Sequence, residues 1–400
     1  MAPLVVLQSS DWHVGSALSG RGLGLTEEFR AKRREEVDSA PERLLAASRE
    51  VRPDVVLLPG DLWDAENVPP ALFRRLVEAF AALAPVPVFV APGNHDFAGP
   101  GGFFDEAFLA ALGLPAWPGN VTVFRRASWE TLPVPGRDDT TVTGRAFLSP
   151  LLEAGRPLDP PPARPLAPYA LLMLHGSLES YRGPDAPTGP KRTAPFSRAE
   201  LSGAGFSWAA LGHHHAFEVV ERLDGSAAGA YSGSPTGRGL DETGPRCFLR
   251  VTLDAGAPPK IETLVSDCRQ VLDVSLEAGG RDADGLREAA LALLLEAGAT
   301  PGDVVRLTVR GSPAGGTRAI HALTDLKGLV AHLVLRDRTV NESEGRTDPS
   351  TAEGRFTLDL EARLAAAPDA RSRRVIEMAC ALGREALLGR LPVPPPAEDV

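Results

Sequence analysis

Five short apolar runs, each of which stops at a polar cluster, constrain the fold of this chain more than any other feature. They are LVVLQ before Asp11, DVVLL before Asp61, VPVFV before Asn94, YALLML before His175 and FSWAALG before His213. Runs of this length without polar alternation predict strands that are buried on both faces. The stretches between the first three runs, residues 27–50 and 69–83, have the apolar spacing of amphipathic helices. The first hundred residues therefore predict a βαβαβ unit.

The polar residues after these runs share a position at the carboxyl end of a predicted strand. In an open α/β sheet such ends lie along one edge, and ligands bind outside it. The candidate metal ligands are Asp11, His13, Asp61, Asn94, His175, His213 and His215. Hard oxygens and imidazoles in this number exceed the needs of one ion. They indicate two first-row metals of the kind that clamps a phosphoryl group, and hence hydrolysis of a phosphate ester.

Three consecutive histidines follow the last of these runs. In extended backbone, successive side chains point to opposite faces. We therefore expect His213 and His215 to serve one site, and His214 to turn toward packing or solvent.

Composition is that of a soluble globular protein. The chain has 400 residues, of which 43% are hydrophobic and 24% charged, enough for one large core and smaller appended units. Three cysteines without metal-type spacing argue against a disulfide framework and favour a cytoplasmic location. The N-terminal segment lacks the pattern of a signal peptide, and no apolar stretch is long enough for a membrane span.

The net charge of −10 is unusual for a protein that holds nucleic acid, because such binding usually shows a basic footprint. Local basic clusters exist at residues 30–34 and 191–198. A solvated helix face and a basic loop explain these two clusters equally well.

Four segments are expected along the chain. Residues 1–270 form the catalytic domain, and residues 271–340 form a small capping domain with a strand at 271–276, a helix near 284–297 and a strand at 303–311. Residues 341–391 combine a polar loop with a helix from about 372 to 388. Residues 392–400 are too rich in proline to pack and predict a disordered tail.

The order of the motifs resembles a known superfamily. DWH at 11–13, GDLWD at 60–64, GNHD at 93–96, His175 and GHHH at 212–215 resemble the calcineurin-like metallophosphoesterases. The resemblance implies an α/β (α+β) fold, a four-layer αββα sandwich with a small C-terminal α/β capping domain.

The resemblance also implies a role for each motif residue. One metal is held by Asp11, His13, Asp61 and His215, and the other by Asp61, Asn94, His175 and His213, so that Asp61 bridges the two. His95 is then not a ligand but acts on the phosphoryl group or the leaving oxygen, with Asp64 as its carboxylate partner. Asp96 supports the loop.

Two further segments narrow the resemblance. WPGNVTVF at 117–124 and YSGSPTGRGLDETGP at 231–245 look like the SbcD/Mre11-type DNA repair nuclease lineage, and most of all like its YhaO-type branch. This lineage implies a phosphodiesterase that uses two divalent ions, with Mn²⁺ expected, cleaves DNA as an exonuclease or endonuclease, and works with an SMC/Rad50-like coiled-coil ATPase. Homodimerisation is left open. Candidate substrate contacts are Arg238, Lys191 and Arg192.

Two alternatives remain open at this point. A phosphodiesterase for cyclic or other small nucleotides would use the same motifs, with the capping domain narrowing the cleft. A non-catalytic scaffold is disfavoured, because no ligand position is lost.

Overall fold

The computed structural model describes residues 2–18, 24–64, 68–150, 155–184, 193–314, 317–339 and 350–387. The chain divides into two compact units. The first consists of Met1–Asp273, Ala297–Arg306 and Lys327–Val334, and the second of Val274–Glu296, Leu307–Leu326 and Leu335–Val400. The domain boundaries expected at residues 270 and 340 stay predictions.

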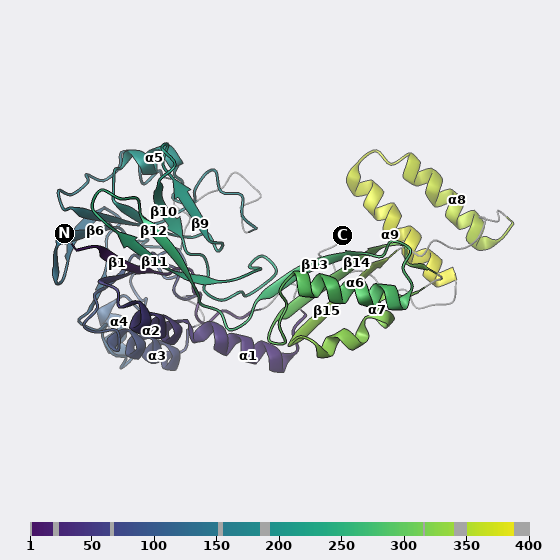
Figure 1. Cartoon of the computed structure of the whole chain (residues 1–400), viewed down its shortest axis with the longest axis horizontal. Coiled ribbons are helices and arrows are strands. Elements are labelled where there is room, and N and C mark those ends of the chain that lie inside the picture. Colours follow the sequence, from purple (N-terminus) through teal and green to yellow (C-terminus); the bar gives the residue numbers. More distant parts are fainter. Residues whose placement is uncertain are drawn as a thin grey trace. The chain divides into compact units, whose positions relative to one another are not determined.

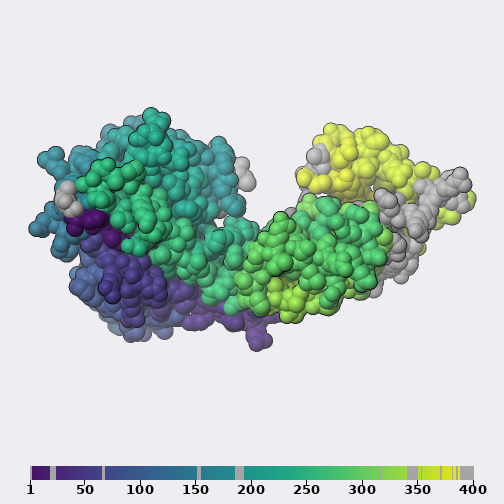
Figure 2. All heavy atoms as spheres, viewed as in Figure 1, coloured from purple at the N-terminus to yellow at the C-terminus, as the bar shows by residue number. Residues whose placement is uncertain are grey.

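The first sheet has the strand order β12-β11-β1-β2-β3-β4. Its parallel part consists of β1 (Leu4–Gln8), β2 (Val55–Leu58), β3 (Val88–Val90) and β4 (Val121–Val123). Antiparallel to β1 runs β11 (Cys247–Leu253), which pairs in turn with β12 (Lys260–Val265). In the space-filling view, purple N-terminal atoms accordingly lie beside the teal-green atoms of later strands (Figure 2).

The second sheet has the order β5-β6-β7-β8-β10-β9. Its strands are β5 (Glu130–Val134), β6 (Arg137–Gly144), β7 (Tyr169–His175), β8 (Trp208–Gly212), β9 (Glu218–Glu221) and β10 (Ala227–Tyr231). The pairs β6·β7, β7·β8 and β8·β10 are parallel. All five predicted strands exist, but they divide between two sheets, so the single sheet edge expected for the polar clusters is replaced by two.

Side-chain alternation along the buried strands explains why the two sheets stack. Val55 and Leu57 belong to the core between the sheets, whereas Val56 and Leu58 belong to the core under the helices. The helices on that side are α1 (Glu27–Asp38), α2 (Ala40–Val51), α3 (Pro70–Ala81) and α4 (Glu106–Ala111). On the far side of the second sheet, α5 (Arg198–Gly203) and its flanking loops enclose a third core (Figure 1). The predicted four-layer αββα sandwich is confirmed.

The remaining elements form a third sheet and a set of helices. The sheet has the order β13-β14-β15, with β13 (Val271–Glu277), β14 (Val304–Gly311) and β15 (His332–Thr339). The helices are α6 (Ala283–Glu296), α7 (Ala319–Ala322), a short 3-10 helix (Thr324–Gly328), α8 (Ala352–Ala365) and α9 (Ala370–Leu387). The predicted β13, α6, β14 and α9 are confirmed, whereas α8 was not predicted. The expected tail at 392–400 lies outside the described residues.

Among all the helices that the structure describes, none is both long enough and apolar enough to cross a membrane.

Candidate metal centre

Loops at the carboxyl ends of five strands deliver the predicted ligands to one place. Asp11 and His13 follow β1, Asp61 follows β2, Asn94 follows β3, His175 ends β7, and His213 and His215 follow β8. Three overlapping groups have ligand atoms within 4.8 Å of one another: Asp11, His13 and His215; Asp11, Asp61 and His175; and His13, Asp64 and His95. Residues more than 200 positions apart in the chain therefore share one centre.

Asp61 lies in the middle of this centre. Its Oδ2 is 3.3 Å from His175 Nε2 and 3.9 Å from His13 Nε2. Its Oδ1 accepts a hydrogen bond from the backbone N–H of His95 at 2.9 Å. The amide oxygen of Asn94 is 3.1 Å from His175 Nε2. An oxygen pair with imidazoles on both sides is the arrangement that a bridging carboxylate needs.

Three of the histidines have their Nδ1 atom anchored by an oxygen. His13 Nδ1 is 2.7 Å from Asp64 Oδ1, His175 Nδ1 is 3.0 Å from the carbonyl oxygen of Pro59, and His215 Nδ1 is 2.9 Å from Glu242 Oε1. An acceptor at Nδ1 keeps the proton there and leaves Nε2 as the ligand atom.

The structure supports the fit of a divalent ion to these residues. Within the described part of the chain, His13 Nε2 is buried and has no hydrogen-bond partner. A buried polar atom without a partner is costly and needs an explanation such as an ion. Imidazole nitrogens, carboxylates and an amide oxygen, with no thiolate among them, suit first-row divalent metals.

Several of the site residues have a backbone that non-glycine residues rarely adopt. The φ angle is +54° at Asp11, +50° at His13, +54° at Asp61 and +106° at His213. Such conformations cost about 1–3 kcal/mol each and cluster at functional sites. The angle at His213 also corrects the strand-alternation argument: β8 ends at Gly212, so a turn and not strand alternation separates the three histidines. His214 is buried and stacks on Tyr181, with ring centroids 3.6 Å apart.

Burial crowds three carboxylates into this centre. Burial raises the pKa of Asp11 to about 6, and burial together with the neighbouring Asp61 raises the pKa of Asp96 to about 7. At Asp61 burial acts in the same direction, but the adjacent His175 holds the pKa of Asp61 well below its usual value. Asp96 accepts hydrogen bonds from the backbone N–H groups of Asp61, Leu62 and Gly93, which fixes the loops that carry the ligands.

His95 and Asp64 form a pair at the edge of the centre. The side chain of His95 is 48% exposed, and its Nδ1 lies 3.2 Å from Asp64 Oδ1. The hydrogen bond to Asp64 raises the pKa of His95 above its ordinary value. The structure differs from the expectation in one respect, since Asp64 is shared and contacts His13 more closely, at 2.7 Å. Because both Nδ1 atoms already contact Asp64, this group is a hydrogen-bonded cluster and not a third ion site.

The three expected substrate contacts are not found at the surface of this centre. Arg238 is 1% exposed, and its guanidinium pairs with the buried Glu242, so it is not available for a phosphate. That expectation is therefore wrong for Arg238. Lys191 and Arg192 lie outside the described residues.

Glu242 is a site residue that sequence reasoning missed. It is fully buried, and although burial opposes this, Arg238 and His215 hold the pKa of Glu242 well below its usual value. The available signal was an acidic residue shortly after the GSPTGRG turn. Nothing local in that turn indicates that it reaches His215.

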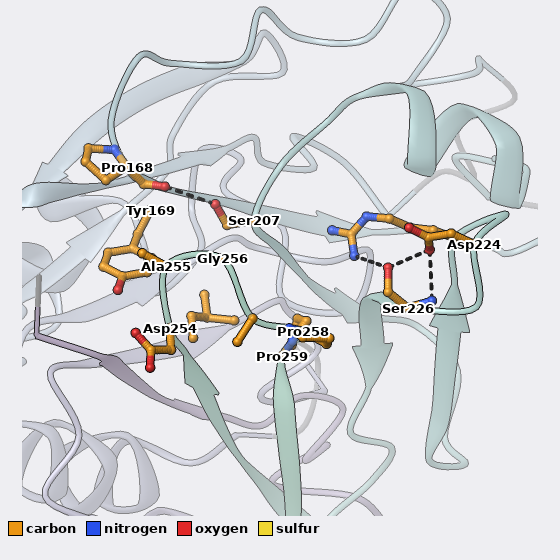
Figure 3. A pocket seen from close by; sticks show the side chains of 13 residues that line it. Pro168, Tyr169, Ser207, Asp224, Ser226, Asp254, Ala255, Gly256, Pro258 and Pro259 are labelled. Atoms are coloured by element: carbon orange, nitrogen blue, oxygen red, sulfur yellow. Dashed lines mark hydrogen bonds between the residues drawn. The ribbon is translucent and has the colours of Figure 1, made fainter.

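A hollow of about 440 Å³ lies elsewhere on the first unit (Figure 3). Its lining includes Tyr169, the first residue of β7, whereas His175 is the last residue of the same strand. The polar groups drawn there bond to one another, for example Ser207 to Pro168 and Ser226 to Asp224. It contains none of the predicted site residues.

Curated relatives match the part of the chain that holds this centre. The chain is 26% identical over 267 residues to the uncharacterized metallophosphoesterase YhaO of Bacillus subtilis, and 28% identical over 263 residues to the DNA double-strand break repair protein Mre11 of Aeropyrum pernix. These matches cover 64% and 63% of this chain, and 59% of each relative. The chain thus spans less than two thirds of the length of these relatives.

One solved structure and one family complete the comparison. The crystal structure of TT1561 from Thermus thermophilus is 12% identical and covers 66% of this chain and all of that protein, with a TM-score of 0.36, too weak to carry an argument. The profile of the calcineurin-like phosphoesterases matches residues 4–217, which is more than half of the chain and includes every predicted ligand. The chain therefore belongs to the calcineurin-like phosphoesterase family.

Proposed function

We propose that this chain is a cytoplasmic, dimetal-dependent phosphodiesterase that acts on DNA. Family membership makes it a phosphoesterase, and the family uses dimetal sites. One observation carries the proposal: candidate ligands from two sheets converge beside the half-exposed His95 and its partner Asp64. A site of this kind can bind a phosphodiester and deliver a proton to it.

The ligand sets follow the family pattern. Asp11, His13, Asp61 and His215 would hold one ion, and Asp61, Asn94, His175 and His213 the other. Two divalent ions there supply positive charge for the phosphoryl group and activate water at neutral pH. We propose Mn²⁺, which accepts both carboxylates and imidazoles.

His95 supplies the proton chemistry. Its raised pKa keeps the imidazole protonated in a larger fraction of molecules near neutral pH, so that it can donate a proton to the leaving oxygen. Asp64 orients the ring through Nδ1, which leaves Nε2 as the donating atom. The backbone N–H of His95 bonds to Asp61 and thereby fixes the distance between the proton donor and the ligands.

DNA as the substrate is supported by the similarity to a relative named as a double-strand break repair protein. The net charge of −10 favours a nuclease that holds DNA weakly when alone. We therefore also propose an SMC/Rad50-like coiled-coil ATPase as the partner that delivers DNA, and homodimerisation of the chain as a further property to measure.

A hydrolysis panel with added Mn²⁺ tests the substrate. It compares linear duplex DNA, single-stranded DNA, cyclic dinucleotides and an aryl phosphodiester. We expect DNA to be cleaved, with cleavage that weakens as salt rises because phosphate contacts are salt-sensitive. Turnover of cyclic nucleotides orders of magnitude faster than any DNA would establish the small-nucleotide alternative instead.

Asp61→Asn is the variant that links this activity to the metals. Asp61 contacts histidines of both ligand sets, so the amide should lose at least one ion. Metal analysis of chelator-stripped and reloaded protein should give two ions for the wild type and fewer for Asp61→Asn. Equal metal contents, or cleavage by the stripped protein, would contradict the dimetal proposal.

A further inference from the structure

The segment from Gly233 to Arg246 encloses His215 on several sides. The carbonyl oxygen of His215 accepts hydrogen bonds from the backbone N–H of Ser234 at 3.0 Å and from Arg246 Nη1 at 2.6 Å. A Cβ atom at Gly233 would lie 2.5 Å from the same oxygen, and Gly233 has a φ of +72°. The backbone of His215 is therefore fixed by a loop that carries none of the predicted metal ligands.

Two side chains of this loop meet at one nitrogen of His215. Glu242 Oε1 lies 2.9 Å from His215 Nδ1, and Arg238 Nη2 lies 3.1 Å from the same atom. Arg238 also donates from Nε to both carboxylate oxygens of Glu242, at 3.1 Å each, and from its backbone N–H to Oε2 at 2.8 Å. Both side chains are buried.

These two neighbours impose opposite demands on the imidazole. A guanidinium can only donate a hydrogen bond, and a carboxylate can only accept one. If Nδ1 carries the proton, it donates to Glu242, and the lone pair of Nε2 is free for a metal. If Nδ1 instead accepts from Arg238, the proton moves to Nε2, and that nitrogen cannot bind an ion.

We propose that Glu242 is a positioning residue that selects the Nδ1–H tautomer of His215 against the competing Arg238, and so makes Nε2 the metal-ligating atom. The inference rests on the proposed metal function of this site. The hydrogen bond to a carboxylate is the stronger of the two choices, because it is assisted by charge and is the shorter contact. Glu242 thus does for His215 what Asp64 does for His13.

The first test reads the tautomer directly. Nitrogen NMR of isotope-labelled histidine in the metal-free wild type, with the His215 signal assigned by its loss in His215→Gln, should show the proton on Nδ1. A proton on Nε2 in the wild type would overturn the proposal. This measurement needs no change to the loop itself, so it remains decisive if loop variants fold poorly.

The second test uses Zn²⁺ as a diamagnetic probe in calorimetric titrations without any substrate. Glu242→Gln should weaken the binding of one of the two ions about 10- to 100-fold, the usual effect of losing the oxygen behind a ligating histidine. Asp241→Asn removes the same charge from the exposed neighbouring residue and should leave both affinities unchanged. Unchanged Zn²⁺ binding by Glu242→Gln would contradict the proposal.

A double variant separates tautomer selection from simple loop folding. In Glu242→Gln with Arg238→Met, the competing donor is gone, and replacing a buried ion pair by neutral groups is often tolerated. The affinity should recover at least tenfold relative to Glu242→Gln alone. A purely structural role predicts instead that the double variant binds Zn²⁺ no better than the single one. If the wild type binds fewer than two ions, the dimetal function fails, whereas the tautomer measurement still decides the role of Glu242.

Discussion

At the scale of single residues, the centre depends on close approach between backbone and side chains. Gly93 is the clearest case, because a Cβ atom there would lie 2.3 Å from Asp61 Oδ1 and 2.8 Å from His175 Cε1. Gly93→Ala should therefore displace both ligands and weaken metal binding at least tenfold. Gly203→Ala is the matched control, since a Cβ atom at Gly203 meets nothing within 4 Å. Metal titrations of the two variants would disprove this reasoning if they gave the same affinity.

His95 and Asp64 separate proton donation from metal binding. His95→Ala should keep both ions but lower turnover of an aryl phosphodiester by about 10²- to 10⁴-fold, the effect of losing a positioned proton donor. Asp64→Asn should in addition weaken metal binding, because Asp64 also contacts His13 Nδ1 at 2.7 Å. Metal analysis and kinetics of the two variants check this difference. Loss of an ion in His95→Ala would make His95 a ligand instead.

At the scale of elements, apolar runs could be predicted because a strand buried on both faces has a simple pattern. The five strands that carry the ligands were predicted for this reason. Their division between two sheets could not be predicted from these runs, since buried parallel strands look alike in either sheet. The hairpin of β5 and β6 was missed because its strands are polar and partly exposed. The stretch 27–50 looked like one helix, yet it breaks at Ser39, just before Pro41.

Helix α1 shows how charge alone can mislead. Arg33 was expected to contact DNA, but it is 1% exposed and bonds to Asp267, Glu36 and the carbonyl oxygen of Gly237. Removing one partner of a buried pair leaves the other charge uncompensated. Arg33→Met should therefore lower the free energy of unfolding by about 3–5 kcal/mol.

Arg34 is the natural control for this prediction. It lies next in the sequence, is 39% exposed and pairs with the exposed Glu27 at 2.9 Å. Exposed pairs contribute about 0–1 kcal/mol, so Arg34→Met should change stability little. Urea denaturation of both variants gives the comparison. Similar losses for the two would show that the buried network of Arg33 does not fasten α1 to the segment at Asp267.

At the scale of the whole molecule, all predicted ligands belong to the first of the two compact units, and they come from both of its sheets. This distribution explains why the individual ligands could be predicted while Glu242 could not. Each ligand follows its own strand directly, whereas the contact between Glu242 and His215 exists only once the loop after β10 has folded back. Local patterns in the sequence carry no information about such a contact.

Metal removal should accordingly loosen one unit and spare the other. Without ions, Asp11, Asp61 and Asp96 remain crowded at 0%, 2% and 1% exposure, and an uncompensated buried charge is costly. Because metal binding and folding are coupled, chelation should lower the protection of amide hydrogens at the ends of β2, β7 and β8. Helix α6, which lies in the second unit, should keep its exchange rates. Hydrogen-exchange mass spectrometry with and without Mn²⁺ measures both regions in one experiment. Equal changes in α6 and in the three strands would mean that the ions stabilise the chain as a whole, and that the two units do not unfold independently.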